Sequence, residues 1–301
     1  MFRIFRDAFR GQGFSGELLG VNARNRRMIL PLNPRRHFPM ADDKLKTKER
    51  MLEAGVPVPE TYEIFSSMID ARHAAARLSQ YEDFVLKPSQ GGGGSGIHVF
   101  VAREENGWRD ASGRLHTPEQ INRHIADIIF GNFAHGLSDR AMAEERIEQA
   151  ELFGEGLFPG LPDLRVITHH ARPVMAMLRI PTKSSGGRAN LHQGAIGIGL
   201  DLSSGKTLHA SFEGKSISLH PDTHANLVDR QVESWRDIMQ VALRAAKSLP
   251  LGYLGLDLCL DAHRGPLVIE ANVRPGLEIQ NANLLGLKRA IGEATSRELK
   301  S

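Results

Sequence analysis

The residues best suited to chemistry lie near the end of the sequence, between Gly255 and Glu278. Polar and apolar residues alternate there, which is typical of two extended strands, and Ala262–Pro266 supplies turn residues between them. One face of such a hairpin would gather Asp257, Glu270 and Asn272. Their oxygen atoms are the hard ligands that Mg²⁺ takes when it also holds phosphate oxygens.

An ordinary antiparallel hairpin with one wet face would show the same alternation. On the return strand, the pattern puts Glu270 on the face of Val268 and Asn272, and Ile269 on the opposite face. The position of Glu270 favours the metal site, because a carboxylate that follows the apolar run 267–269 is costly to bury unless it is paired or metal-bound.

A glycine-rich segment lies between two predicted strands, at residues 83–87 and 97–102. Its match to G-x-G-x-x-G is weak, and a dinucleotide-binding loop would open a helix rather than a strand. The sequence has no G-x-x-x-x-G-K-[ST], H-R-D or D-F-G pattern. A mobile flap remains, whose bare backbone amides can approach phosphates closely, with Lys87 at the strand end in reach of them. The alternative is a flexible hairpin loop.

Positive charge recurs where a polyphosphate would need it. Arg165 lies two residues after Asp163, so both share a strand face, and Arg179, Lys183 and Arg188 crowd one strand end and its loop. Each alone is more often a solvated residue. Together with the acidic hairpin they indicate a phosphoryl-transfer site, in which cationic side chains bind phosphate and carboxylates bind Mg²⁺.

Other catalytic patterns are missing from the sequence. There is no G-x-S-x-G nucleophile and no H-E-x-x-H zinc motif, and the histidines at 169–170, 220 and 224 are interpreted as surface or core residues. The single cysteine, Cys259, excludes an internal disulfide and a cysteine-based zinc site.

The composition indicates a cytoplasmic globular protein. The chain has 301 residues, 41% of them hydrophobic, and a net charge of +3 that does not argue for nucleic acid. No apolar run approaches the roughly 20 residues of a membrane span, and the N-terminus lacks the apolar stretch of a signal peptide. Residues 1–40 hold eight arginines and two acids. Phe2, Phe5 and Phe9 share a helical face there, which could dock on a partner or a membrane surface, although we favour a helix packed on its own domain.

The remaining segments predict helices and strands that do not alternate regularly, which favours an α+β fold over a doubly wound sheet. A capping box at Thr117 with Pro118 predicts a helix that ends at Gly131. Further helices are expected at 42–54, 67–79 and 225–249, and further strands at 142–147, 164–170, 174–179, 193–200 and 206–212.

The order of these motifs resembles the ATP-grasp superfamily. Within it, the chain looks like the alpha-L-glutamate ligase-like proteins, related to the enzyme that adds glutamates to a ribosomal protein tail, with the sugar-transfer-associated ATP-grasp group as close kin. The stretches that carry the resemblance are residues 42–45 with 55–59, 85–88 with 91–96, 163–165 through 188–194, and 255–257 with 270–277. Residues 22–25 also resemble a segment of the glutamate-ligase-like branch.

The resemblance implies an ATP-grasp fold of two lobes with ATP between them. Residues 41–147 would form the N-terminal lobe with the flap, and residues 148–301 the C-terminal lobe with the metal-binding hairpin. Related ligases usually carry a whole α/β domain before the first ATP lysine, whereas here it would be reduced to a basic arm, residues 1–40.

The resemblance also implies roles for individual residues. Lys44 and Lys87 would contact ATP phosphates; spacing alone leaves Lys46 and Lys48 as alternatives to Lys44. The flap would comprise Gly91, Gly92, Gly93, Gly94, Ser95 and Gly96, and the hinge whose backbone reads adenine would comprise Glu144, Glu145, Arg146 and Ile147. Relatives often have Gln first and an aromatic residue third in that hinge. Asp257, Glu270 and Asn272 would hold Mg²⁺, and the catalytic arginines would be Arg165, Arg188 and Arg274.

These residues lead us to expect an ATP-dependent carboxylate–amine ligase that forms an amide through an acyl-phosphate. It would use ATP and two Mg²⁺ ions, which Mn²⁺ could replace. Its substrates would be a small-molecule or peptide carboxylate and an amino-acid amine, glutamate among the candidates. The alternatives are an ATP-binding regulatory or scaffold protein, and a small-molecule kinase. A partner protein on the basic arm and a homo-oligomer are compatible with the sequence.

Overall fold

The computed structural model describes residues 17–134, 136–153 and 157–298, so the phenylalanine stripe of the basic arm lies outside the described residues. Two compact units make up the chain. The smaller unit comprises residues 43–45 and 58–148, and the larger unit comprises residues 1–42, 46–57 and 149–301. Among the described residues, no helix is both long enough and apolar enough to cross a membrane.

The smaller unit is built on a six-stranded antiparallel sheet with the strand order β1-β6-β2-β3-β4-β5. Its strands are β1 (Thr61–Phe65), β2 (Phe84–Pro88), β3 (His98–Glu104), β4 (Gly107–Asp110), β5 (Leu115–His116) and β6 (Ala141–Glu144). The predicted glycine loop therefore connects β2 to a strand and not to a helix, as expected.

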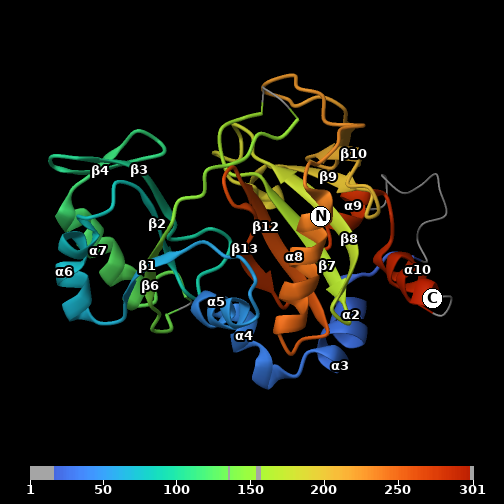
Figure 1. The fold of residues 1–301 in the computed structure, drawn as a ribbon, viewed down its shortest axis with the longest axis horizontal. Helices are drawn as coiled ribbons and strands as arrows, with labels where there is room; N and C mark the ends of the chain where they lie inside the picture. Colours follow the sequence, from blue (N-terminus) through green and yellow to red (C-terminus); the bar gives the residue numbers. More distant parts are fainter. Residues whose placement is uncertain (1–16, 135, 154–156, 299–301) are drawn as a thin grey trace. The chain divides into compact units, whose positions relative to one another are not determined.

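Two neighbouring helices pack on this sheet, α6 (Met68–Leu78) and α7 (Pro118–Ile129) (Figure 1). The predicted capping box at the start of α7 is confirmed: the Thr117 side chain accepts from the Gln120 amide, and the Gln120 side chain accepts from the Thr117 amide. The apolar stripe of α7 is buried in a core with Phe65, Phe84 and Phe100. Burial of that stripe holds the helix on the sheet.

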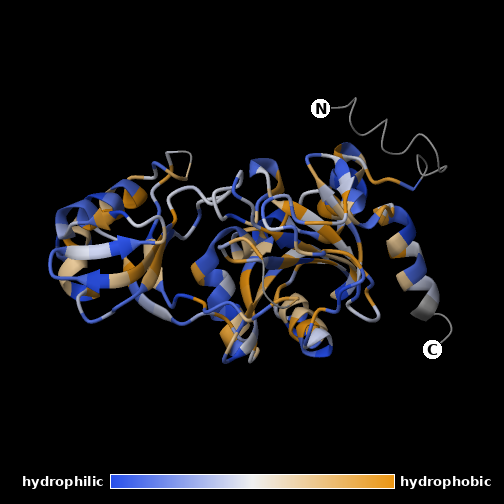
Figure 2. Cartoon of the chain, turned by 90° about the horizontal axis from the view of Figure 1, so that it is seen from above, coloured by the Kyte–Doolittle hydropathy of each residue, from blue (hydrophilic) through white to orange (hydrophobic). Residues whose placement is uncertain are grey.

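The larger unit is built on a seven-stranded antiparallel sheet with the order β11-β10-β9-β8-β7-β12-β13. Its strands are β7 (Asp163–His169), β8 (Arg172–Ile180), β9 (Ile196–Leu200), β10 (Thr207–Phe212), β11 (Lys215–Ile217), β12 (Tyr253–Asp261) and β13 (Gly265–Asn272). Hydrophobic residues predominate along these strands (Figure 2), and every residue of β12 is buried. Antiparallel pairing in both sheets confirms the α+β class.

Helix α8 (Trp235–Ser248) packs on β8, β12 and β13 (Figure 1). The other helices are α2 (Val21–Arg24), α3 (Leu30–Leu32), α4 (Pro39–Asp42), α5 (Lys44–Glu53), α9 (Ile279–Asn283) and α10 (Leu287–Glu298). A π-helical segment joins α2 to α3 at Asn25–Ile29, and single 3₁₀ turns form at Arg35–His37 and Leu191–Gln193.

The helix predicted at 225–249 begins ten residues later than expected. The segment before α8 follows the start of β10, because the Asp229 amide donates to the Thr207 carbonyl and the Arg230 amide to the Thr207 hydroxyl. Asp229 and Ser234 also have positive φ, which an α-helix cannot accommodate. Leu227 is buried, as the helical pattern suggested, but from this irregular segment.

The C-terminal hairpin forms as predicted, except for one bulge. Asp257 lies opposite Glu270, but Leu258 lies opposite Val268, so the return strand holds one extra residue, Ile269. A bulge reverses the alternation beyond it. The prediction that Val268 shares the face of Glu270 is therefore wrong, whereas Asp257 and Glu270 do share a face.

Helix α9 approaches the seven-stranded sheet closely, because glycines occupy two positions beneath it. A Cβ atom at Gly199 would lie 2.3 Å from the carbonyl oxygen of Ala282, and one at Gly197 would lie 3.5 Å from Cβ of Ala282 and 2.9 Å from the Leu191 side chain, which is outside α9. Gly197 and Gly199 lie opposite Arg179 and Met177 on β8. The glycines thus keep α9 on the face of the sheet that carries Arg179.

We predict that Gly199→Ala lowers the free energy of unfolding by about 1–3 kcal/mol, because the new methyl group must displace the backbone of α9. The matched control is Gly292→Ala in α10, where a Cβ atom meets nothing within 4 Å. That change should be neutral or stabilise by up to about 1 kcal/mol, because alanine is the better helix former. Urea denaturation of both variants measures the difference; equal stabilities would contradict this packing.

Candidate functional site

Four charged side chains form a cluster on one face of the seven-stranded sheet. Asp163 and Arg165 come from β7, Arg179 from β8 and Asp257 from β12. Arg165 contacts both carboxylate oxygens of Asp257, with an Nη2–Oδ2 distance of 2.6 Å, and Arg179 contacts both oxygens of Asp163 in the same way. Arg179 Nη2 also lies 2.9 Å from Asp257 Oδ2. We call these four residues the charge cluster.

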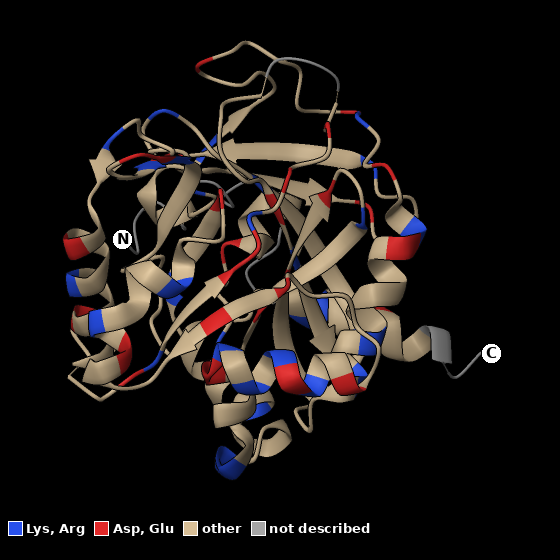
Figure 3. Ribbon diagram, turned by 60° about the vertical axis from the view of Figure 1, so that its left-hand side comes forward, with Lys and Arg blue, Asp and Glu red and all other residues tan. Residues whose placement is uncertain are grey.

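Strand register brings the charge cluster together. Asp257 lies directly opposite Arg165, and Asp163 lies directly opposite Arg179, so opposite charges face each other across both strand pairs. Charged residues are few along the strands of the chain, most of which are tan in Figure 3. The cluster has two positive and two negative charges, and this balance is what makes its burial tolerable.

Asp257 is ionised within the cluster. Burial alone would raise its pKa, but the charges and hydrogen bonds of Arg165 and Arg179 lower the pKa of Asp257 to about 2. A carboxylate has about four lone-pair sites. Two of these sites belong to Asp257 Oδ1, which receives only Arg165 Nε among the guanidinium contacts, so one site on Oδ1 remains.

The other two predicted metal ligands lie beside Asp257. Glu270 is opposite Asp257 and Asn272 is opposite Gly255, so all three predicted ligands occupy the same face of β12 and β13. Asn272 Nδ2 donates to Asp257 Oδ2 over 3.3 Å. Glu270 and Asn272 are only partly buried, in contrast to Asp257. The structure thus brings together the three oxygen-bearing side chains that the sequence singled out.

The three predicted catalytic arginines do not gather in one place. Arg165 belongs to the charge cluster, whereas the Arg188 side chain is exposed in the loop between β8 and β9. Arg274 is also exposed and lies over the ring of Phe38, with its guanidinium carbon 4.8 Å from the ring centroid and Nη1 3.8 Å from Asp42. Arg188 and Arg274 are therefore outside the cluster.

The segment after β13 folds back over the sheet beside the charge cluster. A Cβ atom at Gly255 would lie 2.6 Å from Pro275 and 3.3 Å from Arg165, so only glycine admits this close approach. Arg24 holds the segment in place, because its Nη1 donates to the Pro275 carbonyl over 2.7 Å. The resemblance had included Arg24 without a role; the structure gives it this contact.

In the smaller unit, two of the predicted phosphate-binding lysines are buried. Lys87 at the end of β2 forms an ion pair with Glu144 of β6, the first residue of the predicted hinge. Lys44 donates to the carbonyl oxygen of Gly91 over 2.6 Å, and Lys46 is exposed. Lys44 thus holds the first residue of the glycine loop, and Lys48 is also buried.

The glycine loop is fixed at both ends and exposed between them. A Cβ atom at Gly91 would lie 2.3 Å from Pro88, and one at Gly96 would lie 2.7 Å from the Phe133 ring. His124 Nε2 also contacts the Gly96 carbonyl oxygen over 2.9 Å. Gly92, Gly93 and Ser95 are exposed, and a Cβ atom at Gly92 or Gly93 would meet nothing within 4 Å. Such a loop leaves room for a ligand to approach its backbone.

Sequence reasoning missed the residues that support the start of this loop. Both carboxylate oxygens of Asp139 accept from the Gln90 amide, at 3.1 and 3.0 Å. Asp43 accepts from the Ser89 hydroxyl over 2.5 Å and pairs with Arg140 over 2.7 Å. Only Asp43 carried a signal, because it precedes Lys44 in a stretch typical of the family.

The predicted hinge leaves the sheet after Glu144. The Glu145 amide donates to the Glu60 carbonyl, and its side chain accepts from the Glu60 amide over 3.0 Å. Arg146 pairs with Asp83 over 2.7 Å, and Ile147 is partly buried. The segment is thus anchored by its first three residues, directly before the boundary of the unit at residue 148.

The chain is similar in sequence to a known protein family and to a curated protein. The family model described as sugar-transfer associated ATP-grasp matches residues 23–295. A probable alpha-L-glutamate ligase of Enterobacter sp. (strain 638) is 25% identical over 248 residues, which cover 82% of this chain and 61% of that protein. The chain thus spans about three fifths of the length of this curated relative.

Solved structures of ligases resemble the fold. An ATP-grasp ligase, PsnB, complexed with a minimal precursor, aligns with a TM-score of 0.47 and 16% identity, over 87% of this chain and 62% of that one. An ATP-grasp RimK domain protein from Sphaerobacter thermophilus DSM 20745 aligns with a TM-score of 0.47 and 12% identity, over 87% and 70%. D-alanine–D-alanine ligase from Bacillus anthracis, complexed with ATP, has the same TM-score and identity, over 87% and 67%.

The charge cluster generates a stability prediction. Arg165→Met should lower the free energy of unfolding by about 3–5 kcal/mol, because it leaves two buried carboxylates with one guanidinium. The double variant Arg165→Met/Asp257→Leu should recover at least about 2 kcal/mol of that loss, because Arg179 and Asp163 remain a neutral pair. Chemical denaturation measures all variants.

The control is Lys206→Ala, which removes the exposed ion pair with Asp229 and should cost less than about 1 kcal/mol. If the double variant loses as much unfolding free energy as Arg165→Met and Asp257→Leu lose in sum, Arg165 and Asp257 do not interact as described.

Proposed function

The chain belongs to the sugar-transfer associated ATP-grasp family, and from that premise we propose that it is an ATP-dependent ligase that joins a carboxylate to an amine. The observation that carries the proposal is the placement of Asp257, Glu270 and Asn272 on one face of two adjoining strands, beside paired guanidinium groups. Such an arrangement offers oxygen ligands for a divalent ion next to positive charge for phosphate.

The donor set fits Mg²⁺. Glu270 and Asn272 offer oxygen atoms that are only partly buried, and Asp257 Oδ1 keeps one lone-pair site beyond its contact with Arg165. Hard oxygen donors of this kind suit Mg²⁺, or Mn²⁺ in its place, and not softer metals. Mg²⁺ bound by these residues would neutralise charge on the phosphate oxygens of ATP.

The smaller unit supplies the proposed contacts to the nucleotide. Lys44 and Lys87 would donate to phosphate oxygens, and the exposed backbone of residues 92–95 would cover them as a flap. The backbone of Glu144–Ile147 would pair with the adenine edge. The two lobes of the family, residues 41–147 and 148–301, belong to this same proposal.

The proposed reaction needs no protein nucleophile. A carboxylate oxygen of the acid forms a bond to the γ-phosphorus of ATP as the bond to ADP breaks, which gives an acyl-phosphate. The amine nitrogen then bonds to the acyl carbon, phosphate leaves, and the ammonium proton passes to solvent. Arg165 steadies the carboxylates of the site, and Arg188 and Arg274 have exposed guanidinium groups that can pair with the transferred phosphate. Catalysis rests on positioning and charge neutralisation.

An amino acid is the amine, and a peptide or small molecule the acid, in the proposed reaction. The name of the curated relative, probable alpha-L-glutamate ligase, supports glutamate as the first amine to test. Incubation of the full chain with ATP, Mg²⁺ and panels of acids and amino acids should give ADP release that depends on both. An amide product detected by mass spectrometry supports the ligase; a phosphorylated product without an amide, or no ADP release, contradicts it.

Glu270→Ala should reduce turnover by about 10²–10³-fold, because single groups that stabilise charge in a reaction have effects of this size. The control is Glu293→Ala in α10, an exposed carboxylate paired with Arg289, which should leave turnover unchanged. ADP release at saturating ATP is the measurement. A Glu270→Ala protein with the turnover of the original chain would exclude the metal role.

Lys87→Gln should weaken ATP binding by about 10–100-fold, since a hydrogen bond to a charged group contributes about 1.5–3 kcal/mol. The change also breaks the ion pair between Lys87 and Glu144. The double variant Lys87→Gln/Glu144→Gln therefore serves as a second test, because it removes the charge of Glu144 as well. Lys46→Gln on α5 is the control, and it should bind ATP normally. Isothermal titration with a non-hydrolysable ATP analogue measures the affinities; normal affinity in both Lys87 variants would contradict the assignment.

A further inference from the structure

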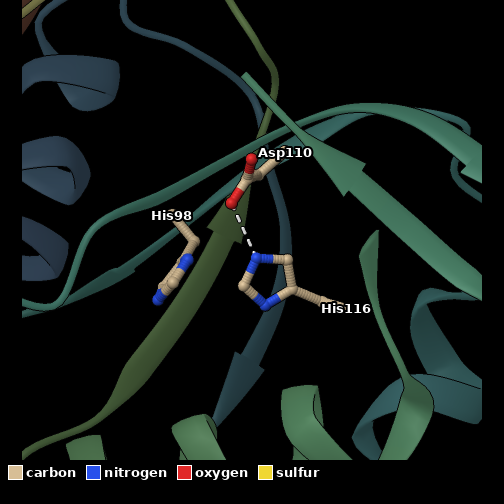
Figure 4. Close-up of side chains that lie close together, drawn as sticks. All are labelled: His98, Asp110 and His116. Carbon is tan, nitrogen blue, oxygen red and sulfur yellow. Dashed lines mark hydrogen bonds and ion pairs between the residues drawn. The ribbon is translucent and has the colours of Figure 1, made fainter. Parts of the chain in front are cut away.

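A group of metal-ligating side chains lies in the smaller unit, apart from the residues proposed to bind ATP and Mg²⁺. His98 of β3, Asp110 of β4 and His116 of β5 each offer one ligand atom, and these three atoms lie within 4.8 Å of one another. His116 Nε2 is 2.7 Å from Asp110 Oδ2, and the His98 ring stands beside this pair (Figure 4). Three consecutive strands of the sheet thus contribute one ligand each.

The backbone holds these strands close together. A Cβ atom at Gly107 would lie 2.0 Å from the His116 carbonyl oxygen, and Gly107 has a φ of +143°, so glycine is required where β4 passes β5. Asp110 is fixed from its other side, because its Oδ1 accepts from the Ser112 hydroxyl and from the amides of Ser112 and Arg114, at 2.6–3.0 Å. Oδ2 therefore points toward His116 and away from the turn.

The surroundings of His98 and Asp110 favour the protonation states in which these groups bind a metal. Burial, and the neighbouring His124 and His116, lower the pKa of His98 to about 4, so its imidazole is neutral near pH 7. Burial would raise the pKa of Asp110, but hydrogen bonds from Ser112, His116 and backbone amides hold it well below its usual range. A neutral imidazole and a carboxylate are ligands as they stand.

An ordinary explanation is available for two of the three residues, because a His116–Asp110 hydrogen bond is stable without a metal. It does not account for His98. The His98 ring is partly buried and packs against His116 and His124, with ring centroids 5.1 and 4.3 Å away. Protonation of His98 is costly in these surroundings. A third donor atom, the imidazole nitrogen of His98, facing a bonded His–Asp pair is what a metal ion would use.

We propose that His98, Asp110 and His116 form a binding site for a zinc-like divalent transition-metal ion. Two imidazoles and one carboxylate suit Zn²⁺ or Co²⁺ and do not suit Mg²⁺. A tetrahedral Zn²⁺ ion has ligands about 2.0–2.1 Å away, which places ligand atoms about 3.3 Å from one another. Binding therefore draws His98 inward and replaces the hydrogen bond between His116 and Asp110, with water as the fourth ligand.

The site has a structural connection to the glycine loop. The His98 ring packs at 80° on the ring of His124, whose Nε2 contacts the Gly96 carbonyl oxygen. An ion on His98 would restrain His124, and through it the last residue of the loop. The metal site neither requires the proposed ligase activity nor uses its residues.

Co²⁺ is the probe, because tetrahedral Co²⁺ absorbs visible light intensely and six-coordinate Co²⁺ does so weakly. The full chain, freed of metal by a chelator, should bind one Co²⁺ with strong visible absorption, and Zn²⁺ should displace it while Mg²⁺ should not. His98→Ala should weaken binding by more than about 100-fold, since even partners of metal ligands contribute 10–100-fold. Asp110→Asn should weaken it as well.

His73→Ala is the matched control, an exposed histidine on α6 of the same unit. It should keep the Co²⁺ absorption, and so should Glu270→Ala, which separates this site from the proposed Mg²⁺ site. Circular dichroism shows whether His98→Ala is folded; if it is not, His98→Gln takes its place. The proposal is overturned if the original chain gives no strong absorption, or if the absorption persists in folded His98 and Asp110 variants.

Discussion

Two carboxylates and two guanidinium groups, buried together on one face of the seven-stranded sheet, are the constraint on which the larger unit depends. Any one of these charges alone would be costly to bury, and removal of one member leaves an uncompensated charge. Strand register solves this problem, because it sets Asp257 opposite Arg165 and Asp163 opposite Arg179. Any slip of one residue would turn these side chains to the other face of the sheet.

The same constraint shapes the proposed chemistry. Contacts from Arg165 and Arg179 take up most of the hydrogen-bonding capacity of Asp257, and the neighbouring Glu270 and Asn272 are only partly buried. The paired guanidinium groups keep the position and charge of Asp257 fixed. Preorganisation of this kind is how a site can stabilise developing charge without rearrangement.

The glycine loop differs from the charge cluster, because only part of the loop is held in place. Its ends are held by close packing against Pro88 and Phe133 and by contacts from Lys44 and His124, whereas its centre is exposed. A loop with fixed ends and a bare centre can change its central backbone without disturbing the sheet. The proposed flap needs this property, and the proposed zinc-like site would act on its fixed end.

Much of this organisation could be predicted from local sequence. Alternation predicted the hairpin that carries Asp257 and Glu270, and the capping box at Thr117 predicted α7, because both signals depend on neighbouring residues. The bulge at Ile269 could not be predicted, because it depends on pairing between two strands. The late start of α8 depends on hydrogen bonds to Thr207, which is distant in sequence.

Dependence on residues that are distant in sequence also explains which features of the candidate sites could not be predicted. Asp163, Arg165 and Arg179 were recognised as charged strand residues, but their pairing with Asp257 depends on the order of strands in the sheet. His98, Asp110 and His116 have no recognisable spacing, because three strands that meet only in the folded sheet supply them. Arg188 and Arg274 carried a family signal, and the structure leaves both exposed.

Transfer of oxygen from the acid to phosphate tests the central claim most directly. An acid that supports turnover is labelled with ¹⁸O in its carboxylate, and the phosphate released with ADP is analysed by mass spectrometry. An acyl-phosphate requires that one carboxylate oxygen leaves with the phosphate, so the account predicts one ¹⁸O atom in each phosphate released. Phosphate without the label would mean that water or another group attacked ATP, and would contradict the ligase mechanism.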